Sequence, residues 1–544
     1  DPRNAKMRQL GDETLGKGLW KLLWMPPTLP YYRPEGLFAQ HQGQSPTKRM
    51  IFSTWTVVPK TISAVLSYEA DRLAFSSFED HPQNTPEARS EYRRLLDFRR
   101  QEGKPAGMPV LAMLYPSPTL AREGDPLPFI QKAAAEESQP PSLSEVISRL
   151  AARFEQLIQG LDLPYEDSGQ PDNAWYWVVP LVLDLQKGGP GHSAWFGQKN
   201  LDRLWMGEDE GEELGEQASG WKEHVRLARE LAFEGFDDLG RPPRDLARIL
   251  ALLALAGPGV CSLRAFGRIA STNKEALSLE ARNQAARTAW AFRRLFNQTK
   301  NQALLRGMDD SRPYWKNVLE YCAEGGLQSV LDEYVHILNE YLGVAGHAYS
   351  QKVSEIGQAI RRALSLKTAR VEVDDIQAAG DGDISINRRN MRSHFALRFG
   401  QQTSEDGTSG ARENQVREAF NSPFWPFVLA TTSVGQEGLD FHPYCHSITH
   451  WNLPSNPVDL EQREGRIHRY KGHAVRKNVA AAYITSLTNG SGRDPWQTLF
   501  EAGDREHRAA SRGLMPFWIF SRENGAAIQR CLASLPLSRE QHSY

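Results

Sequence analysis

The chain has 544 residues, a formal net charge of -2, 40% hydrophobic and 24% charged residues. Its length predicts about two to four domains, and its composition is globular rather than disordered. The balanced charge excludes a globally basic nucleic-acid binder, so such a site would be a local patch. No apolar run reaches the ~18 residues that span a bilayer. Four separated cysteines without a CxxC pair argue against a disulfide framework and indicate the cytoplasm.

Residues 1–47 are rich in proline, glycine and aromatic residues. The prolines of KLLWMPPTLPYYRPEG prevent a continuous helix there, so we expect a connector that packs through its aromatic rings. The chain starts with DPRNAKMRQL, without an initiator methionine or a leader. We therefore expect this connector to continue from a preceding N-terminal lobe.

The connector contains GDETLGKG (residues 11–18), which nearly matches the phosphate-loop pattern GxxxxGK[ST]. A phosphate loop follows an apolar strand and needs a hydroxyl for Mg²⁺. The preceding RNAKMRQL is polar, and Gly18 stands where the hydroxyl residue belongs. We expect a chance match, in which Lys17 does not bind phosphate.

Residues 48–76 contain MIFSTW (residues 50–55) near their start and predict a strand followed by a helix. Residues 77–385 carry long helical periodicities such as PSLSEVISRLAARFEQLIQGL and predict a mainly helical insertion. In residues 386–490, SHFALRFG, FWPFVLATT, CHSITHWNLP and NVAAAYITSL predict strands that alternate with helices. Residues 491–544 are expected to form a C-terminal helical extension. The predicted fold class is therefore α/β, with a parallel-sheet lobe interrupted by a large, mainly α-helical insertion.

Two stretches of this lobe carry chemistry. In ATTSVGQEGLDFH (residues 430–442), a strand runs into hydroxyl residues and glycines that let the backbone approach a ligand. In QREGRIHRYKG (residues 462–472), Gln462, Arg466 and Arg469 have the spacing that would align them on one face of a helix. Forked, permanently charged donors that converge on one point suit a transferring phosphoryl group.

These residues bring out a family resemblance. TTSVGQEGLDF and LEQREGRIHR resemble motifs V and VI of superfamily-2 helicases and translocases, and HWNLPSNPVDLEQREGRIHR is most similar to the Swi/Snf-like branch. MIFSTW resembles motif IV. The resemblance covers residues 48–76 and 392–490 and implies a second RecA-like lobe. Glu464 and the Tyr470-Lys471 pair depart from the pattern, since relatives often carry Gly-Gln after the finger arginine.

The resemblance also implies roles for single residues. Arg469 matches the arginine finger that neutralises the γ-phosphate, Arg466 matches its companion, and Gln462 matches the leading polar residue of motif VI. Gly438 and Asp440 match the glycine and the acid of motif V, which couple nucleotide to nucleic acid.

In the same way, Ser53 and Thr54 of motif IV and Thr432 of motif V match positions that touch the nucleic-acid backbone. ATP and Mg²⁺ would be held mainly by a first RecA-like lobe, through a phosphate-loop lysine and an Asp-Glu pair. Asp184 in LVLDLQ and the pair Asp374-Asp375 in VEVDDIQ lack the context of such a pair, so we interpret them as structural acids.

Other patterns invite weaker hypotheses. His442, His446 and His450 lie four residues apart around Cys445, but Pro443 and the β-branched neighbours argue against a helical zinc site, so we expect no metal. The arginines of INRRNMRSHFALRFG and the run RYKGHAVRK could contact phosphates. The run WYWVVPLVLD is interpreted as core.

The sequence thus predicts half of an ATP-dependent DNA helicase or translocase, inactive without the first lobe. That lobe would lie in the same polypeptide or in a partner chain, and further protein subunits could join. The alternatives are an RNA helicase, or a non-catalytic DNA-binding scaffold with a degenerate lobe. The style of the resemblance also suggests bacterial defence against foreign DNA. The role of the helical insertion is left open.

Overall fold

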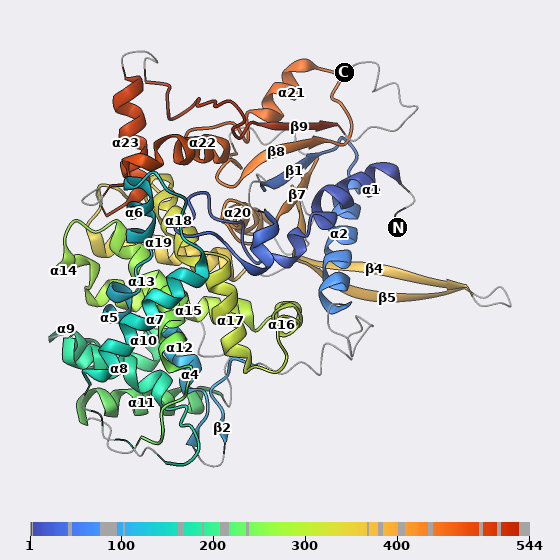
Figure 1. The fold of residues 1–544 in the computed structure, drawn as a ribbon. Coiled ribbons are helices and arrows are strands. Elements are labelled where there is room, and N and C mark those ends of the chain that lie inside the picture. The colour runs from blue at the N-terminus through green and yellow to red at the C-terminus, as the bar shows by residue number, and fades with distance from the viewer. Residues whose placement is uncertain are drawn as a thin grey trace.

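The computed structural model describes most of the chain, and Figure 1 shows a sheet beside a large helical block. The described residues are 2, 4–41, 46–76, 95–101, 104–161, 163, 165, 168–187, 190–206, 217–234, 239–366, 369–378, 384–400, 409–432, 439–488, 493–508 and 513–532.

The sheet has five strands in the order β6-β7-β1-β8-β9, and every neighbouring pair is parallel. Its strands are β6 (Ala396–Phe399), β7 (Val428–Thr431), β1 (Lys48–Phe52), β8 (Cys445–His450) and β9 (Gln529–Leu532). The central strand, β1, precedes the helical block in sequence, and β6, β7 and β8 follow it. The predicted fold class is therefore confirmed, with a parallel α/β lobe interrupted by a large helical region.

Both faces of the sheet are covered, as the short apolar strands of a parallel sheet require. Ile51 belongs to the large core that continues into the helical block. Its neighbours Met50 and Phe52 point to the opposite face, into a smaller core that contains Phe441 and Ile467. Strand alternation thus gives β1 one face toward the insertion and one toward the segments around motifs V and VI.

Five helices accompany the sheet, and their bounds are α2 (Val57–Ser76), α20 (Ser409–Phe420), α21 (Pro457–Glu464), α22 (His473–Tyr483) and α23 (Pro495–His507). Helix α2 packs against β6 and β7, and α22 packs against β8 and α23. The strand–helix order predicted for residues 48–76 is confirmed by β1 and α2.

The predicted strand NVAAAYITSL is wrong, because this segment lies in α22 and the 3-10 turn Ile484–Ser486. Alanine favours helix, and Val475, Val479 and Tyr483 recur every four residues. All three side chains are buried, so this helical stripe packs into the core. The C-terminal extension also differs from the expectation, since β9 follows α23 and adds an edge strand.

The insertion is built of many short helices. They are α4 (Met108–Leu114), α5 (Pro118–Glu123), α6 (Leu127–Ala135), α7 (Leu143–Gln159), α8 (Trp175–Lys187), α9 (Pro190–Phe196), α10 (Leu201–Met206), α11 (Gln217–Glu234), α12 (Leu246–Ala256), α13 (Pro258–Arg268), α14 (Asn273–Ala276), α15 (Leu279–Phe296), α16 (Thr299–Arg306), α17 (Tyr314–Glu324), α18 (Leu327–Tyr341) and α19 (Tyr349–Leu364). Local sequence sets their starts: Ser142 and Glu145 form a capping box at α7.

Two antiparallel ribbons accompany these helices. The short pair is β2 (Arg100–Gln101) with β3 (Lys104–Pro105), and the long pair is β4 (Ala369–Ala378) with β5 (Ile384–Ser393). Figure 1 shows the β4–β5 ribbon extending away from the body of the protein. Among the described residues, no single helix is long and apolar enough to cross a membrane. The bent pair α12 and α13 meets that test only when its two helices are taken together.

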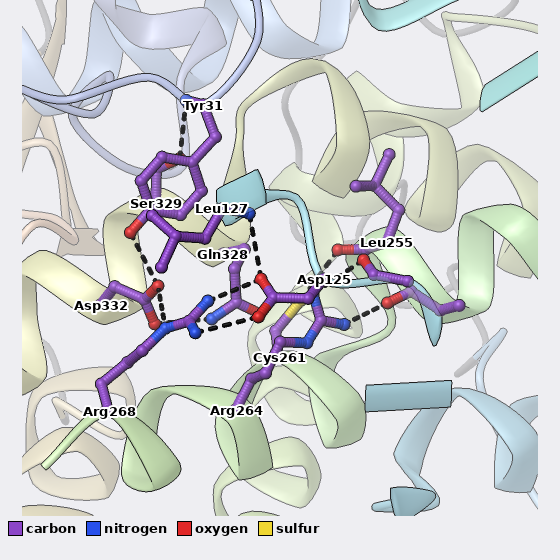
Figure 2. A network of polar contacts seen from close by, with 12 residues as sticks. Tyr31, Asp125, Leu127, Leu255, Cys261, Arg264, Arg268, Gln328, Ser329 and Asp332 are labelled. Atoms are coloured by element: carbon purple, nitrogen blue, oxygen red, sulfur yellow. Dashed lines mark hydrogen bonds and ion pairs between the residues drawn. The ribbon is translucent and has the colours of Figure 1, made fainter. Parts of the chain in front are cut away.

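The N-terminal connector folds as α1 (Ala5–Gly11), the π-helix Asp12–Gly16 and the 3-10 turns Leu19–Lys21 and Gly36–His41. A buried network fastens it to the helical block, as Figure 2 shows. The Tyr31 hydroxyl donates to Asp332 at 2.8 Å. Arg268 pairs with Asp332 at 3.0 Å and, through both terminal nitrogens, with Asp125 at 2.6 and 2.9 Å. The connector is therefore held to the block by a hydrogen bond from Tyr31 to a carboxylate that also pairs with Arg268.

Candidate nucleotide and nucleic-acid site

The carboxyl ends of β1, β7 and β8 meet at one edge of the sheet, because the three strands are parallel. The backbone ladder continues past the strand ends there: Ser53 N–H donates to Thr431 O at 3.1 Å, and Trp451 N–H donates to Phe52 O at 2.8 Å. Ligands of open α/β sheets bind at this edge. Ser53 and Thr54 therefore lie beside the first residues of the stretch that resembles motif V, which include Thr432.

Three hydroxyl residues were expected to touch nucleic acid, and they differ in access. Ser53 is 1% exposed, and its Oγ accepts a hydrogen bond from Trp55 N at 3.1 Å. Thr432 is half-buried, whereas Thr54 is exposed. The Thr54 side chain is thus the one of the three presented most openly to a ligand.

Asn452 holds Thr54 in place, and sequence reasoning missed it. Its Oδ1 accepts from Thr54 N at 3.0 Å, and its Nδ2 donates to Thr54 Oγ1 at 2.6 Å. These two bonds join the loops after β1 and β8. The clue in the sequence is a polar residue directly after the predicted strand CHSITHW, at the edge where strand ends meet.

The helical alignment of Gln462, Arg466 and Arg469 is wrong. Helix α21 ends at Glu464, its C-cap is Gly465, and the next residues form turns. Gln462 is on the exposed side of α21, whereas Arg466 is 5% exposed and lies in the turn. Gly465 follows the last helical residue and separates the glutamine from both arginines.

Two arginines pack beneath this edge on one aromatic ring. The guanidinium carbons of Arg463 and Arg466 lie 5.3 and 5.6 Å from the centre of the Phe52 ring. Arg463 also donates to Asn452 O at 3.4 Å. The Arg466 carbonyl accepts from Phe441 N at 2.9 Å, which ties motif VI to motif V.

Arg469 stands apart from these buried arginines. Its Nε pairs with Asp440 Oδ1 at 3.1 Å, and the two side chains are 40% and 34% exposed. Within the described residues its terminal nitrogens make no hydrogen bond, so they can donate to an anion. The structure thus brings together the motif VI arginine and the motif V acid. Gly438 lies outside the described residues.

The histidines of HPYCHSITH are buried separately rather than gathered. His446 lies in β8 and contacts His473 of α22, with the two Nδ1 atoms 3.1 Å apart. Burial lowers the pKa of His442 and His446 to about 3 and that of His450 to about 4. In the part of the chain that the structure describes, no group of three or more histidine, cysteine or acidic residues could hold a metal ion.

The near-match to a phosphate loop is helical in the structure. Residues 5–16 form α1 and the π-helix, and Gly18 has a φ of 76°. Glu13 forms an ion pair with Arg49 of β1, so the stretch packs against the sheet. A phosphate loop connects a strand to a helix, and this geometry does not resemble one.

The remaining acidic and aromatic candidates lie outside the edge site. Asp184 is fully buried in α8, where it accepts from Tyr115 Oη at 2.7 Å and Thr119 N at 2.8 Å. The core interpretation of WYWVVPLVLD is confirmed, because Trp175 to Asp184 are all buried. Asp374 and Asp375 lie in β4, opposite Arg388 and Asn387.

Comparison with known proteins identifies one region. Residues 397–471 match the family model described as the helicase conserved C-terminal domain. This match supports a superfamily-2 helicase C-terminal lobe. It runs from β6 through the edge site to Lys471 and includes Thr432, Asp440, Arg466 and Arg469. Neither the search of curated proteins nor the search of solved structures found a match.

Proposed function

We propose that this chain supplies the second RecA-like lobe of an ATP-dependent DNA helicase or translocase of the Swi/Snf-like branch. Arg469 carries the proposal. Its guanidinium is held through Nε by Asp440 and keeps its terminal nitrogens for an anion. It also lies within the region that matches the helicase C-terminal domain. Such a positioned, incompletely neutralised arginine suits the charge that develops on a γ-phosphoryl group.

ATP and Mg²⁺ would be held mainly by a first RecA-like lobe, in the same polypeptide or a partner chain. ATP supplies the phosphoryl group that is transferred. Toward it, Arg469 would donate hydrogen bonds, Asp440 would fix the direction of that arginine, and Gln462 would offer its exposed amide. Arg466, buried on Phe52, would hold the end of β1 beneath Arg469.

The nucleic acid would lie along the exposed strand ends. Thr54, oriented by Asn452, would donate its hydroxyl hydrogen to a backbone phosphate, and Thr432 would flank it. We take DNA as the partner, with RNA as the alternative that titration decides. The four free cysteines favour the cytoplasm, where thiols stay reduced.

ATP turnover tests the proposal. The 544-residue chain should hydrolyse no ATP alone and should gain nucleic-acid-stimulated turnover when the first lobe is supplied. Arg469→Ala should then lower turnover by about 10³-fold while sparing nucleic-acid binding. Duplex DNA, single-stranded DNA and RNA, titrated as stimulants, identify the partner.

A matched control separates this effect from the loss of any surface ion pair. Arg362 and Glu418 pair at 2.8 Å with 41% and 37% exposure, close to the values for Arg469 and Asp440. Arg362→Ala should keep turnover near that of the unmodified protein. Equal activity of both variants would refute the role of Arg469.

A further inference from the structure

Trp55 is unusually open to solvent for its type. The chain has 14 tryptophans, and Trp55 is the most exposed, at 58%. Its indole makes no hydrogen bond or ring contact with the residues that the structure describes. Trp518, at 42% exposure, by contrast packs edge-on against Tyr470. The flat apolar face of Trp55 is therefore available to a ligand.

The backbone of Trp55 is firmly held, so the exposed ring stands on a rigid base. Its N–H donates to Ser53 Oγ at 3.1 Å, and its carbonyl accepts from Val58 N at 3.2 Å. The preceding Thr54 is bonded twice to Asn452. The Trp55 ring is therefore not exposed because its loop is loose. Since the backbone is already ordered, binding would cost little backbone conformational entropy.

Two further apolar side chains are exposed on the connections that follow β1 and β8. Val57, at 64% exposure, begins α2 on the same connection, and Val458, at 53%, belongs to α21 after β8. The Thr54–Asn452 bonds join these two connections. The exposed Thr54 hydroxyl and the Trp55 ring are consecutive, about 3.8 Å apart between Cα atoms. Neighbouring groups of one nucleotide, its backbone phosphate and its flat base, would therefore meet neighbouring residues.

We propose that Trp55 stacks on a base of single-stranded nucleic acid whose backbone is held at Thr54. This inference rests on the proposed function and names the form in which its nucleic acid is bound at the strand ends. Stacking on an aromatic ring accepts any base, because every base has a flat π face. The contact would therefore favour unpaired strands over duplex without selecting a sequence.

Fluorescence anisotropy with the 544-residue chain tests this contact. The probes are a labelled oligothymidylate and an oligonucleotide of equal length without bases. Trp55→Ala should weaken oligothymidylate binding by about 5- to 150-fold, the range for one stacked base. Trp55→Phe should bind within about threefold of the original chain, because a smaller aromatic ring still stacks. The probe without bases should bind weakly, and equally to the original chain and to Trp55→Ala.

Trp518→Ala is the matched control, since it removes the other exposed tryptophan. It should leave oligothymidylate binding unchanged, and circular dichroism should show every variant folded. Unchanged binding by Trp55→Ala, or equal affinity for the two probes, would overturn the stacking contact alone. If the original chain bound no nucleic acid, the nucleic-acid part of the proposed function would fall as well. The role of Arg469 is tested separately by turnover.

Discussion

Arg466 and Arg469 are three residues apart and occupy opposite environments. Arg466 is 5% exposed and packs on Phe52, whereas Arg469 is 40% exposed and pairs with Asp440. A buried guanidinium is fixed by its surroundings, and an exposed one with unused donors can meet a ligand. The two arginines should therefore respond differently to substitution, through stability at Arg466 and through turnover at Arg469.

Lys48 shows that a buried cation at the start of β1 can serve the fold alone. It is 0% exposed, and its ammonium donates to three carbonyls, those of Ala419, Phe420 and Phe424, at 3.2, 3.0 and 2.5 Å. Two of these carbonyls belong to the last turn of α20. The lysine thus caps that helix from the central strand of the sheet.

We expect Lys48→Met to destabilise the protein by about 3 kcal/mol, because three buried carbonyls lose their donor while the apolar stem is kept. Urea unfolding followed by circular dichroism measures this. Lys60→Met, at an exposed position in α2, is the control and should change stability by less than about 0.5 kcal/mol. If Lys48→Met were as stable as the original chain, other donors would have to replace the Lys48 ammonium.

The contact between β8 and α22 joins two neutral histidines. His446 and His473 bring their Nδ1 atoms to 3.1 Å, and Thr47 Oγ1 lies 3.4 Å from His473 Nδ1. Burial lowers the pKa of His446 to about 3 and that of His473 well below its ordinary value. The unfolded chain, with histidine pKa values of about 6.5, binds these protons much earlier.

The protein should therefore become less stable as the pH is lowered. Between about pH 6.5 and pH 3 the unfolded state binds more protons, so the free energy of unfolding decreases as pH falls, by about 1.4 kcal/mol per pH unit for each histidine. His446→Leu should reduce this slope by about that amount. Urea unfolding at pH 7, 6 and 5 measures the slope, with His468→Leu, at an exposed position, as control. Parallel slopes for His446→Leu and the original chain would contradict the assignment.

At the scale of elements, the sequence predicted those helices and strands that form from short local stretches of the chain. Strands β1 and β7 follow from short apolar runs, β8 follows from its β-branched residues, and the helical block follows from its periodicity and caps. The edge strand β9 was missed because QRCL has no apolar run, and pairing with β8 makes it a strand. The pairing of Thr54 with Asn452 depends on the neighbourhood of β1 and β8, which no local pattern contains.

Of the two motifs, the sequence likewise predicted one feature and not another. The sequence predicted that Arg469 and Asp440 belong to one site, because the order and spacing of two motifs are themselves informative. It did not predict the end of α21 at Glu464, although Gly465 offered that information. Helical periodicity continues across Gly465, a residue of low helix propensity, and so predicts an open helix face for Arg466, which lies buried instead.

At the scale of the whole molecule, the insertion and the sheet share one hydrophobic core. Ile51, Val428 and Ala430 of the sheet belong to the same buried cluster as α12, α13 and α15 of the block. The N-terminal connector contacts the block through Tyr31 and Asp332, beside Arg268, and contacts β1 through the Glu13–Arg49 ion pair. We infer that the block and the lobe stabilise each other rather than fold as separate domains.

Arg268 tests whether the lobe unfolds together with the block, because two carboxylates of the block depend on it. It binds Asp125 through two nitrogens and Asp332 through the third, and Asp332 is 1% exposed. Arg268→Met would leave both carboxylates without their cation, and it should cost about 3–5 kcal/mol at pH 7. The unpaired carboxylates would then bind protons at higher pH than in the original chain. The deficit should therefore shrink as pH falls toward 5.

Arg248→Met provides the comparison. The Arg248 side chain is 45% exposed and pairs with Glu320, so its substitution should cost no more than about 1 kcal/mol. Urea unfolding at pH 7 and pH 5, followed by far-ultraviolet circular dichroism and by tryptophan fluorescence, measures both variants. If block and lobe form one unit, Arg268→Met shifts both signals together. Two separated transitions would mean that the network fastens the connector to a block that folds independently. A deficit that did not change with pH would mean that neither carboxylate is left charged and unpaired.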